Sequence, residues 1–149
     1  MRVAIGNDHR GVAAKQRLAD MLAQAGHEVC DAGANGAESV DYPDIASQVA
    51  GQVAAGQCDR GILICGTGVG MMIAANKVHG VRAAIGCDEL TAEMSRRHND
   101  TNVLCLSADM LGEHQVRRIV DIWLATAFEG GRHARRVEKI RAIEDNQRP

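Results

Sequence analysis

The sequence predicts an α/β fold in which one parallel sheet lies between two layers of helices. Short apolar runs alternate with amphipathic segments along the chain, which is typical of βαβ units. The central run, residues 62–64, is followed at once by a glycine-rich turn and a helix-like segment. A length of 149 residues suits one hydrophobic core, so residues 1–149 are expected to form a single domain.

The first half of the chain is expected to alternate strand and helix twice. Leu18, Leu22 and Ala25 repeat at the spacing of one helix face, and Pro43 is tolerated in a first helical turn. The expected elements are a strand at residues 3–5, a helix ending at Gly26, a strand at 28–31, a loop at 32–41, and a helix that starts at Asp41 and ends at Gly56.

The second half continues this alternation and ends in two helices. The expected elements are a strand at residues 62–64, a helix opening at 71–75, a strand at 81–85, a helix at 89–97, a strand at 103–106, a helix at 116–127, and a helix from 132 to about 146. The final helix has only a thin apolar stripe, at Val137, Ile140 and Ile143. It is too polar to bury much within its own domain, so we expect it to pack on a partner subunit.

Composition excludes several classes of function. A net charge of −2 gives no electrostatic basis for binding nucleic acid or an acidic membrane surface. The only aromatic residues are Tyr42, Trp123 and Phe128, which argues against stacking on single-stranded nucleic acid. No apolar run is long enough to span a bilayer, and we expect no signal peptide.

The cysteines indicate a reducing environment. Their number is odd and no CxxC occurs among Cys30, Cys58, Cys65, Cys87 and Cys105. Free thiols in a cytoplasmic protein fit this pattern better than a disulfide framework, and a structural zinc site is not expected. We interpret every cysteine except Cys65 as a packing residue.

The main candidate site is Cys65 together with the segment that follows it, Gly66 to Gly70, which is called the glycine loop below. A strand, a glycine-rich turn and a helix start together place unpaired backbone N–H groups around a small space, which suits an anion. A helix start also favours thiolate over thiol, so Cys65 is a candidate base or nucleophile. The alternative is that Cys65 is a small core residue, as free cysteines commonly are.

Other polar residues are expected to gather around this loop. The loops after the first, third and fifth strands should meet at one edge of the sheet, which brings Asp8, His9 and Asp109 towards Cys65 and Thr67. Alternatively, Asp8 caps the first helix, and the histidines are ordinary surface residues.

His98 and Asn99 precede the fifth strand and should lie at the opposite end of the sheet. A partner subunit could supply them to the glycine loop. Arg132 and Arg136 lie four residues apart on one helix face. They form either a phosphate clamp or a solvated charged face.

Nucleotide binding is the competing interpretation of the glycines. Asp88 lies about twenty residues further on, where a dinucleotide site places the acid that binds the ribose. The pattern is GxGxG after the third strand, however, and the turn after the first strand lacks the fingerprint.

Taken together, the motifs resemble the ribose-5-phosphate isomerase B family, which includes galactose-6-phosphate and allose-6-phosphate isomerases. The matching motifs are GNDH at 6–9, DYPD at 41–44, GILICGTGVG at 61–70, AANK at 74–77, SRRHND at 95–100, and EGGRH at 129–133 with Arg136. The resemblance covers essentially the whole chain. It implies a Rossmann-like five-stranded parallel sheet, and dimers or tetramers whose active sites lie between subunits.

The resemblance also implies a function. Members interconvert aldose and ketose sugar phosphates without a metal or an organic cofactor, which here most directly means ribose 5-phosphate and ribulose 5-phosphate. The implied roles are Cys65 as base, assisted by Thr67; Gly66, Gly68, Gly70 and Asn99 at the enediolate oxygens; His98 in ring opening; Asp8 binding or helping at the sugar hydroxyls; and His9, Arg132 and Arg136 at the phosphate. Tyr42 is expected among the substrate-binding residues.

Two positions depart from the family pattern. Where members commonly carry an arginine near the phosphate, this chain has Asp109, so the clamp is expected to rely on Arg132, Arg136 and His9, with Arg135 as a possible substitute. Where some relatives carry a glutamate base, this chain has Met71, which leaves Cys65 as the base. The alternatives are an isomerase of another aldose phosphate and a non-catalytic sugar-phosphate or nucleotide sensor.

Overall fold

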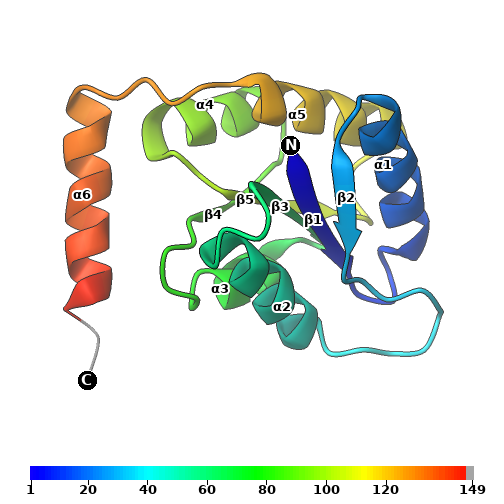
Figure 1. Cartoon of the computed structure of the whole chain (residues 1–149). Helices are drawn as coiled ribbons and strands as arrows, with labels where there is room; N and C mark the ends of the chain where they lie inside the picture. The colour runs from blue at the N-terminus through cyan, green and yellow to red at the C-terminus, as the bar shows by residue number, and fades with distance from the viewer. Residues whose placement is uncertain (147–149) are drawn as a thin grey trace.

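The computed structural model describes residues 1–146, which form a three-layer α/β fold around a five-stranded parallel sheet (Figure 1). The predicted fold class is confirmed. The strands are β1 (Arg2–Asn7), β2 (Glu28–Asp31), β3 (Arg60–Cys65), β4 (Ala83–Ile85) and β5 (Val103–Ser107). The helices are α1 (Val12–Gln24), α2 (Tyr42–Ala54), α3 (Val69–Ala75), α4 (Glu89–Asn99), α5 (Glu113–Ala125) and α6 (Arg132–Asp145).

The strand order decides which loops become neighbours. It runs β2-β1-β3-β5-β4, and Gly61 of β3 is in register with both Ala4 of β1 and Val103 of β5. The carboxyl ends of β1, β3 and β5 therefore lie side by side at one edge of the sheet. This arrangement confirms the expectation that the loops after the first, third and fifth strands would meet.

Two aliphatic cores cover the two faces of the sheet. Helices α2 and α3 pack on one face, and α1, α4 and α5 pack on the other (Figure 1). Trp123 is fully buried in the second core, and its indole Nε1 donates a hydrogen bond of 3.0 Å to Thr101 Oγ1. The near-absence of aromatic residues thus gives a core of small aliphatic side chains with one large exception.

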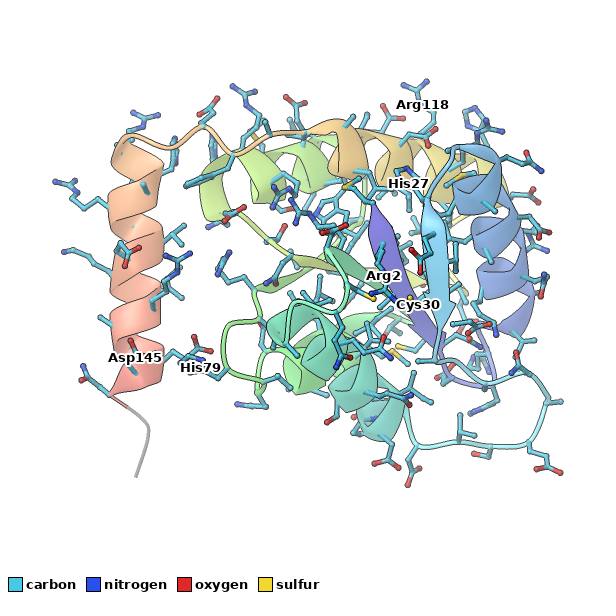
Figure 2. All side chains as sticks on the ribbon, in the orientation of Figure 1. Arg2, His27, Cys30, His79, Arg118 and Asp145 are labelled. Carbon is cyan, nitrogen blue, oxygen red and sulfur yellow. The ribbon has the colours of Figure 1, made fainter. Side chains whose placement is uncertain are left out.

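Helix α6 stands beside the three layers rather than within them (Figure 1). Of its residues only His133 and Val137 are buried, whereas Ile140 and Ile143 are 44% and 60% exposed. Its last turn contacts the segment before β4 through Asp145, whose Oδ1 lies 2.9 Å from His79 Nε2 (Figure 2). The helix therefore buries little within its own chain, as its composition predicted.

Several helix ends differ from the sequence prediction by a few residues, and two of them have a clear local cause. Helix α4 continues to Asn99, so His98 and Asn99 occupy its last turn rather than a loop. Asp100 ends the helix with a left-handed backbone, φ 47°, a conformation that Asp tolerates better than most residues. Helix α5 ends at Ala125 because Thr126 has an extended backbone, ψ 125°.

All five cysteines are free, and one of them contradicts the packing interpretation. Cys58 and Cys105 are buried, and burial raises the pKa of Cys58 to about 11. Cys87 is exposed because it lies in the turn between β4 and α4, so its interpretation as a packing residue was wrong. None of the helices within residues 1–146 has both the length and the apolar character of a membrane span.

Candidate active site

Cys65 ends β3 beneath the glycine loop. Its side chain is buried, and its Sγ accepts a hydrogen bond of 3.1 Å from the backbone N–H of Gly68. Gly68 directly precedes α3 and has a left-handed backbone, φ 79°. A β-carbon there would also lie 3.1 Å from the backbone carbon of Leu106. Glycine is therefore required both for the turn and for the close approach to β5.

Short contacts to β5 and α2 hold the glycine loop in place. Ser107 Oγ donates to the carbonyl of Gly66 over 2.6 Å, and the amide of Ala108 donates to the carbonyl of Cys65 over 2.9 Å. On the other side Tyr42 lies against Gly70, where an added β-carbon would be 2.7 Å from the phenol ring. The ring is 41% exposed, so Tyr42 forms part of the open rim of this loop.

The loop after β1 lies at the same edge of the sheet. The amide of Asp8 donates to the carbonyl of Ile64 over 3.1 Å, which places Asp8 next to the end of β3. Its carboxylate accepts the amide of Arg10 over 2.9 Å. The N-cap of α1 is Gly11, so the alternative that Asp8 caps this helix was wrong. Within residues 1–146 the buried Nδ1 of the half-buried His9 has no hydrogen-bond partner.

Asp109 joins this group through a residue that the sequence analysis missed. Its carboxylate pairs with the guanidinium of Arg10, with Nη2 to Oδ2 at 2.9 Å. The two residues are 99 positions apart, and no periodicity or motif links them. The only available signal was the position of Arg10 directly after His9.

His98 belongs to a second group on α4 and α6. Its ring stacks on that of His133, with centroids 4.1 Å apart and planes 1° from parallel. Glu129 Oε2 lies 3.4 Å from His133 Nε2 and 3.8 Å from His98 Nε2. We call these three residues the histidine cluster. His133 lay within a recognised motif but was not predicted as a site residue.

The charges around the histidine cluster favour an anion over a metal ion. The three ligand atoms lie within 4.8 Å of one another, a spacing that a metal could use. Arg97 already pairs with Glu129, however, and its hydrogen bond lowers the pKa of that carboxyl. Arg132 Nε points at His133 Nε2 over 3.4 Å. These guanidinium groups oppose an added cation.

Burial lowers the pKa of His133, and the nearby charges of His98 and Arg132 lower it further. The imidazole is therefore kept neutral to a lower pH than a free histidine. A neutral ring can stack on His98 without charge repulsion.

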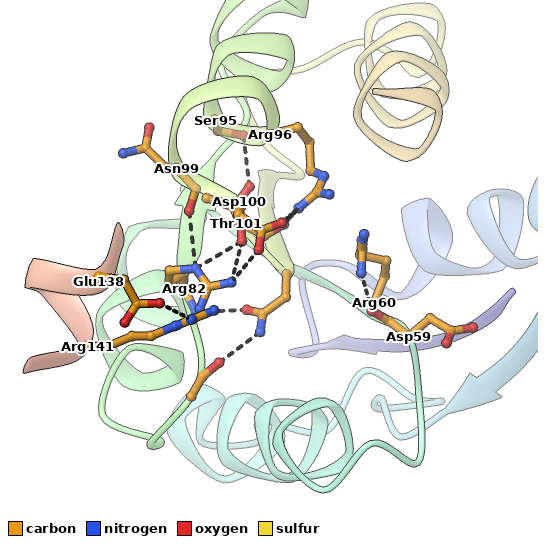
Figure 3. A network of polar contacts seen from close by, with 12 residues as sticks. Asp59, Arg60, Arg82, Ser95, Arg96, Asn99, Asp100, Thr101, Glu138 and Arg141 are labelled. Carbon is orange, nitrogen blue, oxygen red and sulfur yellow. Dashed lines mark hydrogen bonds and ion pairs between the residues drawn. The ribbon is translucent and has the colours of Figure 1, made fainter. Parts of the chain in front are cut away.

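The turn after α4 is held by a network of arginine and carboxylate groups (Figure 3). Arg82 Nη2 bonds both the carbonyl and the carboxylate of Asp100, at 2.7 Å and 3.0 Å. Arg96 Nη1 lies 2.9 Å from the other carboxylate oxygen. Arg82 Nε also bonds the carbonyl of Asn99 over 3.1 Å. These bonds fix the backbone of Asn99, although the residue itself is exposed.

The predicted site residues thus fall into two groups. Residues at the carboxyl edge of the sheet are brought together: Asp8, His9, Tyr42, Cys65, Gly66, Thr67, Gly68 and Gly70. The others lie on α4 and α6: His98, Asn99, Arg132 and Arg136. Arg132 and Arg136 are exposed on α6. Within residues 1–146, the histidine cluster contacts residues of α4, of α6 and of the segment before α6. None of these contacts is with the glycine loop.

Asp88 has a structural task that removes the main support for a dinucleotide site. It caps α4, with its carboxylate accepting the amide of Thr91 over 2.6 Å. This hydrogen bond lowers the pKa of the Asp88 carboxyl. A carboxylate turned towards its own helix is not free for a ribose.

Known proteins resemble this chain over its whole length. A family model described as Ribose/Galactose Isomerase matches residues 3–140. Ribose-5-phosphate isomerase B of Escherichia coli (strain K12) is 49% identical over 146 residues, which are 98% of this chain and 98% of that protein.

Solved structures agree with the sequence comparison. Ribose-5-phosphate isomerase B of Clostridium thermocellum matches with a TM-score of 0.98 and 51% identity, covering 99% of this chain and 100% of that chain. The Mycoplasma genitalium protein, solved with bound ribulose-5-phosphate, matches with a TM-score of 0.95 and 43% identity, covering 98% and 97%. The similarity therefore extends over the described fold and is not confined to the glycine loop.

Proposed function

The chain belongs to the ribose/galactose isomerase family, and on that premise we propose that it interconverts ribose 5-phosphate and ribulose 5-phosphate. The whole-length similarity to ribose-5-phosphate isomerases B supports this choice of substrate. The observation that carries the proposal is the position of Cys65. Its thiol lies at the carboxyl end of the central strand, beneath the glycine loop, and accepts a backbone hydrogen bond.

The reaction moves a proton between two adjacent carbons. A base removes the proton from C2 of the open-chain aldose, which leaves an enediolate. A proton is then returned to C1, while a hydroxyl proton passes from the oxygen on C2 to the oxygen on C1. The substrate exchanges no electrons with another molecule, so the chemistry needs a base and an oxyanion site but no redox partner.

Cys65 is the proposed base. The amide of Gly68 is aimed at its sulfur, and a donor in that position stabilises negative charge there. The amides of Gly66 and Gly70 and the side chain of Asn99 would stabilise the enediolate oxygens. Thr67, which is exposed two residues after Cys65 in the chain, would assist the proton transfer.

The remaining residues would bind and open the sugar. Asp8, buried beside the end of β3, and Tyr42, at the rim of the glycine loop, would contact the sugar hydroxyls. His98 would open the furanose ring. His9, Arg132 and Arg136 would hold the phosphate, since guanidinium groups match phosphate oxygens in geometry and charge.

A homodimer, or a tetramer built from such dimers, would unite the two groups of residues. Apolar side chains near the glycine loop are exposed, with Val69 at 44% and Ile73 at 54%. Ile140 and Ile143 are exposed on α6, which also carries Arg132 and Arg136. Burying such surface against a second copy would be favourable. It would also allow α4 and α6 of one subunit to complete the site of the other.

The five free thiols are consistent with a reducing compartment. We therefore propose that the protein works in the cytoplasm. Fractionation of the source cells with an antibody to this chain would test this, and recovery in an oxidising compartment would contradict it.

The reaction is tested on a panel of ribose 5-phosphate, allose 6-phosphate, galactose 6-phosphate and erythrose 4-phosphate. We expect turnover of ribose 5-phosphate, and in Cys65→Ala a loss of kcat of about 10²–10⁴-fold with ligand binding retained. Cys87→Ser is the matched control, because this cysteine is exposed and outside the site. Preference for another sugar would change the assigned substrate. Binding without turnover across the panel would indicate a sensor instead.

The shared site is tested by mixing two impaired variants at a substrate concentration well below the wild-type KM. Arg136→Ala is expected to have little activity there because its KM is strongly raised, and Cys65→Ala because its kcat is reduced. If Arg136 of one subunit serves Cys65 of the other, a mixed dimer contains one intact site. Unfolding and refolding the two variants together should then restore about a quarter of wild-type activity. No restoration, in a preparation that contains mixed dimers, would contradict a site shared in this way.

A further inference from the structure

Arg10 and Asp109 form an ion pair directly against the glycine loop. Arg10 Nε lies 3.2 Å and 3.0 Å from the two carboxylate oxygens of Asp109, and Nη2 lies 2.9 Å from Oδ2. A β-carbon added at Gly66 would lie 3.0 Å from Asp109 Oδ2 and 3.3 Å from Cδ and Nε of Arg10. The pair therefore joins the loop after β1 to the loop after β5 beside the proposed reaction centre.

Both partners are anchored through their backbones to that centre. The amide of Asp109 donates to the carbonyl of Gly66 over 3.2 Å. The amide of Arg10 donates to Asp8 Oδ1 over 2.9 Å. The pair is thus tied to the same two segments that carry Asp8 and Cys65.

The guanidinium keeps part of its binding capacity. A guanidinium has five N–H donors, and Asp109 engages Nε and Nη2. Both hydrogens of Nη1 and one of Nη2 remain for another acceptor, because within residues 1–146 the Arg10 side chain donates only to Asp109. The side chain is 57% exposed. A guanidinium already oriented by a carboxylate loses less conformational freedom when an anion binds.

Asp109 alone would repel a phosphate, but the pair does not present a bare carboxylate. Asp109 is engaged by the cation, and the free edge of Arg10 offers hydrogens in the planar arrangement that suits phosphate oxygens. His9, the proposed phosphate ligand, is the preceding residue in the chain. The chain therefore presents an arginine beside Asp109 although position 109 itself is acidic.

We infer that Arg10 binds the phosphate group of the sugar phosphate and that Asp109 is its positioning residue. This inference rests on the proposed function for the identity of the substrate. Its ligand chemistry is a phosphate dianion, so inorganic phosphate can probe the same contact without turnover. Arg135, an alternative suggested by the sequence, lies on α6 with Arg132 and Arg136, so like them it would reach this edge of the sheet from a partner subunit.

The test compares Arg10→Gln, Arg10→Lys and Asp109→Asn with a matched control. Arg17→Gln removes a similar exposed ion pair, since Arg17 Nε lies 3.2 Å from Glu113 between α1 and α5, outside the site. For each protein we would measure kcat and KM for ribose 5-phosphate. The dissociation constant of inorganic phosphate is measured by calorimetry, and the melting temperature serves as a check on folding.

Arg10→Gln should raise KM and the phosphate dissociation constant together, by about tenfold, with kcat within about twofold of wild type. Arg10→Lys keeps the positive charge but lacks the planar pair of N–H donors, so its phosphate binding should be intermediate between wild type and Arg10→Gln. Asp109→Asn should weaken phosphate binding by about threefold, because the guanidinium is no longer held in place. Arg17→Gln should leave all three constants unchanged.

Two results would overturn the inference. One is a folded Arg10→Gln protein whose KM and phosphate dissociation constant both equal those of wild type, which would leave the pair a structural link between loops. The other is a fall in kcat alone. If the wild-type protein isomerises no sugar phosphate, the proposed function fails, but the calorimetric comparison of wild type with Arg10→Gln still decides whether Arg10 binds phosphate.

Discussion

The backbone amide of Gly68 donates a hydrogen bond of 3.1 Å to the Sγ of Cys65, three residues earlier in the chain. The contact exists because Gly68 turns the chain with φ 79° just before α3 begins. It links the conformation of one glycine to the electrostatic environment of the proposed base. Any side chain at position 68 would therefore disturb both the turn and the hydrogen bond to Cys65.

Gly68→Ala should therefore reduce both stability and activity. A left-handed backbone costs a non-glycine residue roughly 1–2 kcal/mol, and the added methyl group would press on the carbonyl of Leu106. We expect the free energy of unfolding in urea to fall by at least this amount and kcat to fall with it. Gly51→Ala is the matched control. It lies within α2 with open space around it, and should stabilise the protein by roughly 0.5–1 kcal/mol. Equal stability of the two variants would contradict the role of Gly68.

Gly70→Ala should act through Tyr42. The added methyl group would lie 2.7 Å from the phenol ring, and the ring, being partly exposed, can move away. We expect the fold to survive and kcat/KM to fall on the order of tenfold, because displaced binding groups misplace the substrate. A double-mutant cycle with Tyr42→Ala measures the coupling. Strictly additive effects would show that Gly70 acts independently of the ring.

Thr101→Val should destabilise the second core. The hydroxyl accepts the indole N–H of Trp123 over 3.0 Å and contacts Ser95 Oγ over 3.0 Å. Valine keeps the shape but leaves the buried indole N–H without an acceptor, which should cost about 1–3 kcal/mol. Urea unfolding measures this loss. Ser47→Ala, which removes an exposed hydroxyl on α2, serves as the control and should change stability by about 0.5 kcal/mol or less. An equally small effect of Thr101→Val would contradict this account.

The stability of the protein should decline with acidification through His133. Burial lowers the pKa of this histidine below its ordinary value of 6.5. The unfolded chain therefore takes up the proton first as pH falls. The contribution of His133 is complete above about pH 6.5 and is lost as pH falls through the folded-state pKa.

His133→Asn should accordingly show a shallower decline in unfolding free energy between about pH 7 and pH 5. His98, Arg132, Arg136 and Glu129 influence the same ring, so the measurement is a difference between two complete pH series. His114→Asn, an exposed histidine on α5, is the control and should follow wild type. Parallel curves for wild type and His133→Asn would refute the assignment.

Local patterns were enough to predict the order of the elements. The alternation of apolar runs and amphipathic segments predicted every strand and helix. The residues after the first, third and fifth strands were correctly expected at one edge of the sheet. The end of α4 was missed because Asp100 adopts a left-handed backbone supported by Arg82, a contact that spans 18 positions. Cys87 was misjudged because the exposure of a residue that follows a strand depends on which other segments pack over it, and that is not a local property of the sequence.

Periodicity, turn residues and motif spacing are properties of a few consecutive residues, so the sequence alone determined the fold class and the position of Cys65 before the glycine loop. Which side chains face one another depends on the order of the strands and the packing of the helices. Only the tertiary structure paired Arg10 with Asp109, stacked His98 on His133, and laid Tyr42 against Gly70. Each of these contacts joins segments that are distant in the chain, and their geometry is set by the whole sheet rather than by local sequence.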